Sequence, residues 1–213
     1  MTPIQASQLA REICELAPIV PVLVVDDAAH AQPLAQALIT GGLPALEVTL
    51  RTPAALEVIA EMAKVEGGVV GAGTLLTPED VQAAIDAGAK FGVSPGATDR
   101  LLDACEEAGL PLLPGVASAT EAMRLLERGY TMLKFFPAEA AGGAPAVKAI
   151  GAPIPQVSFC PTGGVSPANA NSYLSLPNVV CAGGSWVAPK DKMQAGDWDG
   201  ITTIAKAAAA LSR

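Results

Sequence analysis

Short apolar runs recur along the chain and alternate with longer segments of mixed polarity. Eight such runs can be counted, and their first residues are 20 to 26 positions apart. Short apolar runs bounded by turn-forming residues are typical of buried strands. They predict strands at 19–25, 45–50, 68–74, 90–96, 110–116, 131–137, 156–164 and 179–185.

The segments between these runs carry apolar residues at the i, i+3 and i+4 spacing of amphipathic helices. Ser or Thr, which cap helix N-termini, opens each segment, and Gly closes several of them. We predict helices within TPAALEVIAEMAK (52–64), TPEDVQAAIDAGA (77–89), TDRLLDACEEAG (98–109) and SATEAMRLLERG (118–129). A further helix is predicted ahead of the first strand, within TPIQASQLAREICELAP (2–18).

The alternation of strands and helices predicts βα units with a parallel sheet. Eight units in about 200 residues fit an α/β fold of the (β/α)₈ TIM-barrel type with an extra N-terminal helix. A doubly wound open sheet is the alternative that this pattern leaves open. No linker or low-complexity stretch divides the chain, so we expect residues 1–213 to form one barrel domain.

Composition fits a globular protein and narrows its partners. The 213 residues are 51% hydrophobic and 16% charged, which is enough apolar material for a sizeable core. A net charge of −8 without a Lys/Arg cluster disfavours nucleic acid as a partner. The chain has neither an uninterrupted apolar run of about 18 residues nor the basic and apolar pattern of a signal peptide. We therefore expect a cytoplasmic protein that does not bind a membrane.

Cysteine and histidine usage excludes several kinds of site. The four cysteines are widely spaced and form no C-x-x-C pair, so we interpret them as buried free thiols. The single histidine, His30, would have to serve any Ser-His-Asp triad or multi-histidine zinc site. We expect it to lie at a helix entry, and we expect no metal or other cofactor.

Lys134 stands out because it lies within the apolar segment TMLKFFP (131–137). Active sites of barrels lie at the carboxyl ends of the strands, where this segment and ALEVTLR (45–51) bring Lys134, Glu47, Thr49 and Arg51. Because side chains alternate along a strand, Lys134 can point inward together with Glu47. A solvated lysine on an edge strand is the alternative.

A buried lysine favours nucleophilic chemistry. Burial disfavours the charged ammonium, and a neutral amine can attack a carbonyl to form a Schiff base. Glu47 could then move protons as a general acid and base, or it could serve only as an ion-pair partner. The planar guanidinium of Arg51 suits the carboxylate of a 2-keto acid, although pairing with a neighbouring Asp or Glu would explain it equally well.

Glycines end the last two predicted strands, in FCPTGGVSP (159–167) and CAGGSW (181–186). Barrels often bind phosphate at this place through backbone amides and a helix N-terminus. Each pair of glycines alone could equally mark a tight turn. Together they predict a phosphate site formed by Gly163, Gly164, Gly183, Gly184 and Ser185.

Six ordered motifs give the chain a resemblance to a known family. The motifs are LEVTLR (46–51), GAGT (71–74), SPG (94–96), KFFPAE (134–139), FCPTGG (159–164) and GGSW (183–186). They resemble the 2-keto-3-deoxy-6-phosphogluconate (KDPG) aldolases of the Entner–Doudoroff pathway, which often also act on 4-hydroxy-2-oxoglutarate. The resemblance implies a metal-independent class I lyase that forms pyruvate and glyceraldehyde 3-phosphate, and a protein that is commonly a homotrimer.

The resemblance also implies roles for individual residues. Lys134 matches the Schiff-base lysine and Glu47 the general acid and base. The remaining positions match substrate contacts: Arg51, Thr74 and Pro95 around the pyruvate moiety, Phe136 beside the lysine, and Thr162, Gly163, Gly164, Gly183, Gly184 and Ser185 around the phosphate.

Two other functions remain open from the sequence. A phosphosugar isomerase or epimerase on the same barrel would use the carboxylate without a nucleophilic lysine. A non-catalytic barrel that binds a phosphorylated metabolite would show binding without turnover.

Overall fold

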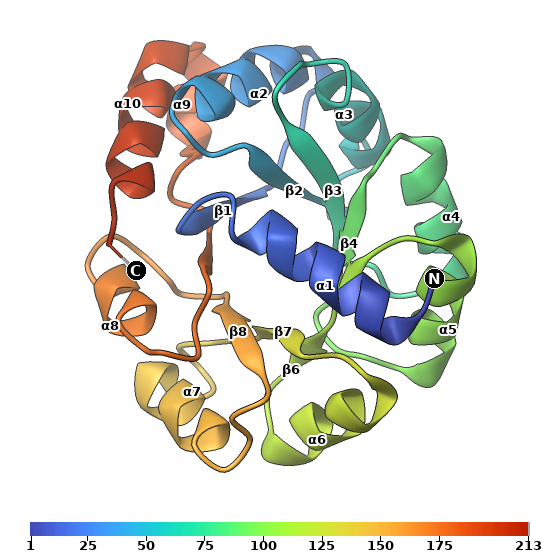
Figure 1. The fold of residues 1–213 in the computed structure, drawn as a ribbon. Helices are drawn as coiled ribbons and strands as arrows, with labels where there is room; N and C mark the ends of the chain where they lie inside the picture. The colour runs from blue at the N-terminus through green and yellow to red at the C-terminus, as the bar shows by residue number, and fades with distance from the viewer. Residues whose placement is uncertain (213) are drawn as a thin grey trace.

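The computed structural model describes residues 1–212 and places short parallel strands inside a ring of helices (Figure 1). Each of the eight predicted apolar runs contains a strand, so this part of the prediction is confirmed. The strands are β1 (Ile19–Leu23), β2 (Ala45–Thr49), β3 (Val69–Gly73), β4 (Phe91–Val93), β5 (Leu112–Leu113), β6 (Gly115–Val116), β7 (Met132–Phe135), β8 (Ser158–Pro161) and β9 (Ala182–Gly184).

The strands follow one another in space almost as they do in sequence. One sheet has the order β5-β4-β3-β2-β1-β9 and the other β6-β7-β8, with parallel pairing throughout. Because β1 pairs with both β2 and β9, the sheet curls back on itself into a TIM-barrel-like arrangement. A doubly wound open sheet, whose strand order reverses, is not what the chain forms.

Pro114 divides the fifth predicted strand into β5 and β6. A proline has no N–H to donate to a ladder, so regular pairing breaks at this position. Its carbonyl still accepts a hydrogen bond from the Lys134 amide at 2.9 Å. The chain therefore passes from one sheet to the other at Pro114 while staying beside β7.

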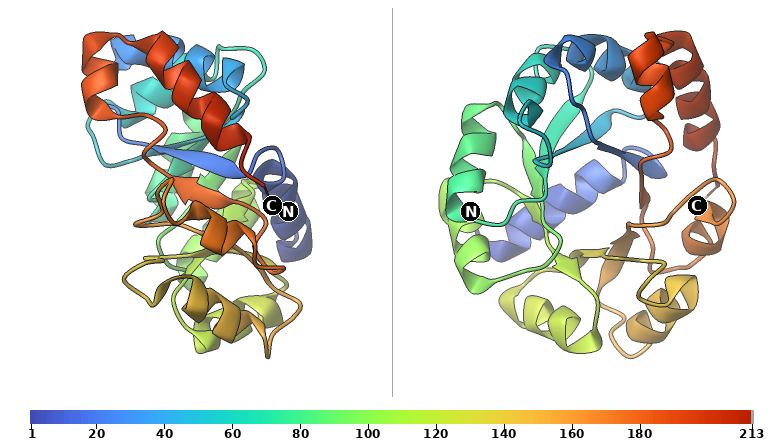
Figure 2. Two further views of the ribbon diagram at one scale, coloured as in Figure 1. Left: turned by 90° about the vertical axis from the view of Figure 1, so that its left-hand side faces the viewer. Right: turned by 180° about the vertical axis from the view of Figure 1, so that it is seen from behind.

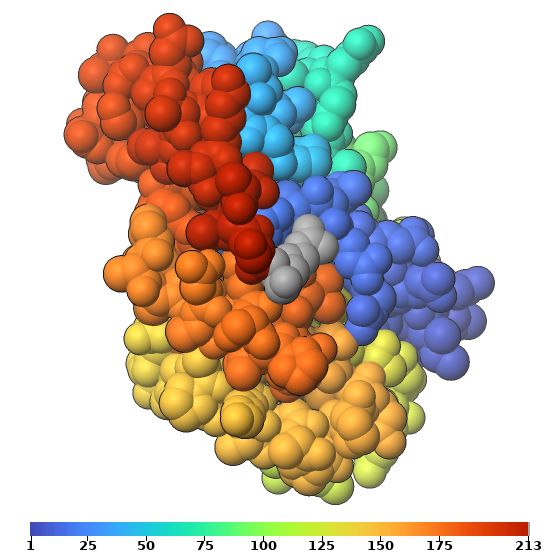
Figure 3. Space-filling view, turned by 60° about the vertical axis from the view of Figure 1, so that its left-hand side comes forward, coloured from blue at the N-terminus to red at the C-terminus, as the bar shows by residue number. Residues whose placement is uncertain are grey.

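The helices that follow the strands lie outside them, as the two turned views show (Figure 2). They are α2 (Ala31–Thr40), α3 (Ala55–Met62), α4 (Pro78–Asp86), α5 (Asp99–Ala108), α6 (Ala119–Arg128), α7 (Gly143–Gly151), α8 (Ala170–Leu174), α9 (Lys190–Ala195) and α10 (Trp198–Ala209), with a 3₁₀ turn at Ala28–His30. The last helix packs beside the first of this ring (Figure 3). There, Thr202 of α10 donates a hydrogen bond to the Ala37 carbonyl of α2 at 3.1 Å. Among residues 1–212, no helix has the length and apolar character needed to cross a membrane.

Most of the predicted caps are present. Thr77, Thr98 and Ser118 accept a hydrogen bond from the amide three residues later, and Thr77 forms a capping box with Asp80. Thr52 is the exception, because its hydroxyl donates to the Val25 carbonyl at 2.7 Å. The cap predicted at Thr52 was therefore wrong, and α3 begins three residues later without a side-chain cap.

A helix at residues Pro3–Cys14, α1, precedes the first strand and lies across one end of the strands (Figure 1). Its Ser7 hydroxyl accepts hydrogen bonds from the amides of Thr131 and Met132, at 2.8 and 2.9 Å. Met132 is the first residue of β7 and Thr131 precedes it, so α1 covers the amino ends of the strands. The opposite, carboxyl end is left for a site.

Inward-facing positions change from apolar to polar along several strands. Near α1, a buried cluster of Val20, Ala45, Met132, Cys160 and Cys181 fills the interior. Two residues further along the same strands come Val22, Glu47, Lys134, Thr162 and Gly183, all of which line a cavity. Because side chains alternate with a period of two along each strand, the layer that lines the cavity lies directly above the buried apolar cluster. All four cysteines are buried and free, as the sequence predicted.

Candidate active site

A cavity of about 470 Å³ opens at the carboxyl ends of the strands. Most of the residues singled out in the sequence lie around it, although they come from six different strand ends. The lining residues are Val22, Val24, Glu47, Thr49, Arg51, Thr74, Pro95, Lys134, Phe136, Thr162, Gly163, Gly164, Val165, Gly183 and Ser185.

Lys134 and Glu47 form a buried pair at the base of this cavity. Lys134 Nζ lies 3.4 Å from Glu47 Oε1, and the two residues are only 6% and 2% exposed. The solvated edge-strand lysine is thus excluded. Pairing is needed here, since a buried charge without a partner is costly. The distance is long for a charge-assisted hydrogen bond, so the pair holds both groups near one another without locking them together.

The surroundings of Glu47 adjust its proton affinity. Burial raises the pKa of the Glu47 carboxyl above its usual value, and the nearby Lys134 ammonium opposes that shift only in part. A carboxyl whose pKa is moved towards neutrality can both release and take up a proton under working conditions. The chemistry expected of a general acid and base therefore fits the position of Glu47.

Gly73 leaves the space that the Glu47 side chain occupies. A Cβ built on Gly73 would lie 2.8 Å from Glu47 Cγ and would also overlap the carboxylate. Glu47 and Gly73 come close because β2 and β3 are paired, with Thr49 opposite Gly73. The second glycine of GAGT, Gly73, is therefore needed because a side chain there would collide with Glu47.

Changing Gly73 to alanine should displace Glu47 and reduce turnover by more than about tenfold, since a misplacement of about 1 Å can cost about 100-fold in rate. Steady-state kinetics of purified Gly73→Ala would measure this loss. Gly96→Ala is the matched control, because a Cβ there meets no atom within 4 Å and should leave the rate near wild type. Similar rates for both variants would show that Gly73 does not position the carboxylate.

Phe136 forms one wall beside the lysine. Lys134 Nζ lies 5.2 Å from the centre of the Phe136 ring, within the range of a cation–π contact. The ring lies on one side of the amine, and both residues line the cavity. Phe136 thereby helps to keep the lysine in an apolar setting.

Arg51, Thr74 and Pro95 surround the mouth of the cavity near Glu47. Arg51 is exposed and takes part in no ion pair within residues 1–212, so its pairing with a neighbouring carboxylate is not observed. Thr74 adopts a left-handed backbone with φ of 66°, which is rare for a β-branched residue. Strain of this kind, about 1–3 kcal/mol, is typical of functional sites.

The glycines after β8 and β9 meet at the other side of the cavity. An isolated parallel bridge joins Thr162 to Gly183, and a Cβ on Gly183 would lie 2.9 Å from Thr162 Cγ2. Gly163 and Gly164 have φ values of 101° and 78°, which favour glycine. The two segments expected to bind phosphate are therefore adjacent and expose backbone to the cavity.

Gly184 is the one predicted site residue that does not line the cavity. A Cβ on Gly184 would meet the ring of Trp186, so this position faces away from the cavity. The residue is buried beside Pro21 of β1. Its lack of a side chain makes room for Trp186, and only its backbone lies near the candidate phosphate site.

A family model described as KDPG and KHG aldolase matches residues 10–204. The chain belongs to this aldolase family. It is accordingly an enzyme of the lyase class, as the motifs in the sequence predicted.

Similar proteins support the same family. A 2-dehydro-3-deoxy-phosphogluconate aldolase from Pseudoalteromonas atlantica is 54% identical over 202 residues, which is 94% of this chain and 94% of that protein. A KDPG aldolase of Zymomonas mobilis, solved with 3-phosphoglycerate, superposes with a TM-score of 0.93 at 48% identity and covers 97% of this chain and 98% of its own. The KDPG aldolase of Legionella pneumophila, solved with pyruvate captured at low pH as a covalent carbinolamine, has a TM-score of 0.91 at 44% identity, covering 94% and 98%.

Sequence reasoning missed three residues that line the cavity of this aldolase. Val22 and Val24 come from the end of β1 and the residue just beyond it, and Val165 follows the glycines after β8. The alternation in IVPVLVV could have placed Val22 and Val24 on one face. Nothing in the sequence around Val165 distinguishes a lining residue from one that packs beneath a helix.

No group of three or more His, Cys, Asp or Glu side chains within residues 1–212 is arranged to hold a metal ion. His30 lies at the entry to α2, where it contacts the ring of Trp198. Its position at a helix entry agrees with the prediction.

Proposed function

We propose that this chain is a class I aldolase that cleaves 2-dehydro-3-deoxy-6-phosphogluconate to pyruvate and glyceraldehyde 3-phosphate, and that it also acts on 4-hydroxy-2-oxoglutarate. The observation that carries the proposal is the buried Lys134–Glu47 pair, which faces a cavity at the carboxyl ends of the strands. The names of the relatives and the carbinolamine in the Legionella enzyme support it.

Lys134 supplies the nucleophile in this proposal. Its neutral amine attacks the ketone carbonyl of the substrate, and the resulting carbinolamine loses water to give a cationic imine. The imine accepts the electrons of the C3–C4 bond when that bond breaks. The pyruvate part remains on Lys134 as an enamine, and the aldehyde part leaves.

Glu47 moves the protons that this sequence requires. It takes the proton of the C4 hydroxyl as the C3–C4 bond breaks, and a proton is then returned to C3 of the enamine. Water hydrolyses the imine and releases pyruvate and the free amine. A single carboxyl beside Nζ can serve each of these steps, because C2 is bonded to that nitrogen and C3 and C4 follow it directly in the substrate chain.

The rest of the cavity divides between the two ends of the substrate. Arg51, with Thr74 and Pro95, binds the carboxylate end, since a guanidinium fork matches a carboxylate. The phosphate end lies against the amides and hydroxyls opposite: Thr162, Gly163, Gly164, Gly183, Gly184 and Ser185. Backbone amides allow an acidic protein to bind a dianion without a basic patch.

The raised pKa of Glu47 gives the activity a pH dependence. Glu47 accepts a proton only when ionised, so kcat/KM should fall as the pH drops through a value above the ordinary range of a glutamate. Protein stability depends on pH in the opposite sense. The contribution of Glu47 protonation to the free energy of unfolding is present at low pH and is lost as the pH rises through the raised pKa. A pH–rate profile measures the first effect. An acid limb at an ordinary carboxyl value, or the same limb in a residually active Glu47→Gln enzyme, would contradict the assignment.

The two other functions are less well supported. An isomerase needs the carboxylate but gives no reason to bury an amine 3.4 Å from it. A binding protein gives no reason to hold Glu47 with a raised pKa inside the cavity. The aldolase accounts for both groups.

We also infer that residues 1–213 form one closed (β/α)₈ barrel with α1 as an additional helix, and a homotrimer in the cytoplasm. Parallel bridges between Phe159 and Val179 and between Thr162 and Gly183 support closure between β8 and β9. Four free cysteines suit a reducing compartment. Sedimentation analysis tests the trimer, which a monomeric mass at micromolar concentration would contradict.

Pyruvate release tests the proposed function directly. The purified protein is incubated with 2-dehydro-3-deoxy-6-phosphogluconate or 4-hydroxy-2-oxoglutarate, and pyruvate is followed by coupled oxidation of NADH. We expect turnover of both substrates and faster turnover of the phosphorylated one. Absence of pyruvate from both, with a folded protein, would refute the proposal.

A further inference from the structure

We propose that Asn169 is a positioning residue that holds the glycine loop at residues 163–166 in its phosphate-binding shape, with Glu139 as a second support. This inference rests on the proposed function for the identity of the ligand end involved. Asn169 does not line the substrate cavity, so it acts through the loop and not by contact with the substrate.

The side chain of Asn169 forms its hydrogen bonds with the loop. Its Oδ1 accepts hydrogen bonds from the Ser166 amide at 2.7 Å and the Ser166 hydroxyl at 3.3 Å, and its Nδ2 donates to the Gly164 carbonyl at 3.1 Å. Asn169 stands at the N-cap of α8, where an asparagine ordinarily caps its own helix. Here it makes no such cap bond, because the side chain turns back to the loop.

Glu139 supports the loop from the segment after β7. Its amide donates to the Gly163 carbonyl at 3.0 Å, and its Cβ and Cγ lie 2.7 and 2.6 Å from where a Cβ on Gly164 would be. Its carboxylate accepts a hydrogen bond from the buried Tyr173 hydroxyl on α8. The helix therefore holds the loop twice, directly through Asn169 and indirectly through Tyr173 and Glu139.

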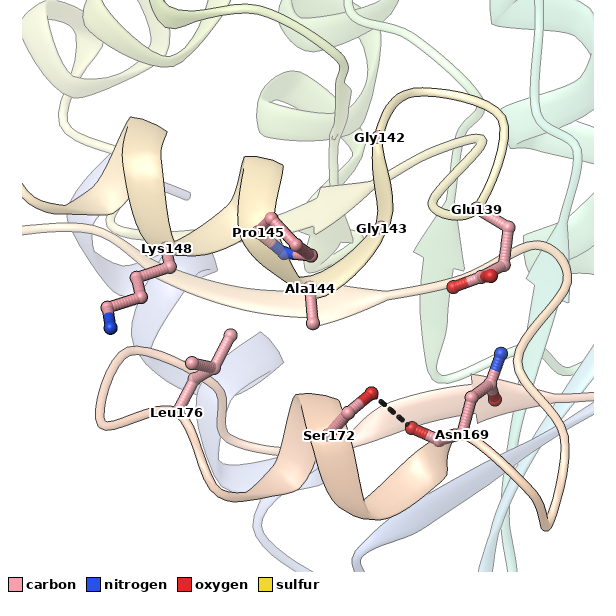
Figure 4. A pocket seen from close by; sticks show the side chains of 9 residues that line it. All are labelled: Glu139, Gly142, Gly143, Ala144, Pro145, Lys148, Asn169, Ser172 and Leu176. Atoms are coloured by element: carbon pink, nitrogen blue, oxygen red, sulfur yellow. Dashed lines mark hydrogen bonds between the residues drawn. The ribbon is translucent and has the colours of Figure 1, made fainter.

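Figure 4 shows Glu139 and Asn169, the two residues that support the loop. Glu139 and Asn169 approach each other from opposite sides of a second cavity, of about 790 Å³, between α7 and α8. The two residues that support the loop thus border open space, so hydrogen bonds to the loop hold it where packed side chains do not. Without Asn169 the loop would gain conformational freedom that binding would have to remove.

Loss of the hydrogen bonds that hold the loop should weaken binding of the phosphate end of the substrate only. Phosphate binding requires ordered amides at Gly163 and Gly164, whereas imine formation uses Lys134 and Glu47 on other strands. Loss of hydrogen bonds to one loop should lower kcat/KM for the phosphorylated substrate about 10- to 100-fold, mainly through KM. Reactions without a phosphate should change less than about twofold.

The test compares Asn169→Ala with Asn171→Ala, a control at an exposed asparagine two residues further along. Three readouts are measured for each: kinetics with 2-dehydro-3-deoxy-6-phosphogluconate, kinetics with 4-hydroxy-2-oxoglutarate, and exchange of pyruvate methyl protons with solvent. We expect only the first to change, and only in Asn169→Ala. Ser185→Ala shows the pattern expected when a phosphate contact is lost directly. Asn169→Asp should be impaired in the same readout as Asn169→Ala, because it lacks the donor to Gly164 and adds a negative charge. Equal loss in all three readouts would assign Asn169 to the general fold and overturn the inference.

Binding of 3-phosphoglycerate, measured by calorimetry, separates this inference from the proposed function. Affinity should fall about 10- to 100-fold in Asn169→Ala and stay unchanged in Asn171→Ala, whether or not the wild type cleaves the keto acid. An inactive wild type with this binding pattern would refute the aldolase assignment and keep the role of Asn169. Unchanged affinity in Asn169→Ala would overturn the role of Asn169.

Discussion

Replacing Lys134 with methionine should abolish aldol cleavage, with a fall in kcat/KM of at least about 10⁴-fold. Removal of a covalent nucleophile costs up to about 10⁶-fold in other enzymes, and methionine has no nitrogen with which to form an imine. Methionine also keeps the length and apolar character of the lysine stem, so the cavity should keep its shape. Pyruvate release measures the loss, and the exposed lysine variant Lys148→Met should stay near wild type.

A stability measurement separates this chemical effect from misfolding. In Lys134→Met the Glu47 carboxyl is buried without its cation, which should lower the free energy of unfolding at neutral pH by about 3–5 kcal/mol. Lys134→Met combined with Glu47→Gln removes both charges and should recover much of that loss while staying inactive. A Lys134→Met enzyme with more than about a tenth of wild-type activity would remove the lysine from the mechanism.

Glu47→Gln should lower turnover by about 10² to 10⁴-fold. Glutamine preserves the shape of the side chain and its contact with Gly73, but it can no longer take up the proton of the C4 hydroxyl. Some imine should still form, because Lys134 is intact. Single-turnover kinetics with the phosphorylated keto acid would separate the slow proton transfer from substrate binding.

An exposed carboxylate gives the matched comparison for Glu47. Glu57 lies on the solvent side of α3, and Glu57→Gln should keep wild-type turnover. A near-wild-type rate in Glu47→Gln would instead make Glu47 an ion-pair partner that holds Lys134 in place, which is the structural alternative that the sequence left open.

The buried pair of Lys134 and Glu47 could be predicted because each member is a charged residue in an otherwise apolar strand. Alternation along a strand then places Glu47 and Lys134 on the inner face, and no knowledge of distant contacts is required. The same rule, applied to adjacent residues, implies that Gly183 and Gly184 face opposite sides. Only Gly183 lines the cavity, and this distinction was available in the sequence.

The caps could be predicted in part from local sequence, whereas features that depend on contacts between distant segments could not. Thr77 and Thr52 both precede a proline, but only Thr77 has an acidic partner, Asp80, three residues later that completes a capping box. Thr52 has Ala55 at the corresponding place, and its hydroxyl bonds to Val25 in another segment. The same holds for Asn169, whose partners lie in a loop that is defined only once β8 and α8 are in place.

The lining valines were missed for a different physical reason. An apolar side chain at a strand end has the same sequence pattern whether it borders a cavity or packs beneath a helix. Val22 and Val165 both border the cavity, and Val165 is 7% exposed and also belongs to the main core. A charged residue reveals a cavity because burial would otherwise be costly, whereas a valine carries no such signal.

Covalent trapping is the most direct test of the central claim that Lys134 forms an imine. Borohydride added to the protein in the presence of pyruvate should inactivate it and attach a reduced pyruvate adduct to the peptide that contains Lys134, as peptide mass spectrometry would detect. Lys134→Met should take up no adduct. An adduct on Lys90 or Lys148 with Lys134 unmodified, or full activity after treatment, would contradict the account.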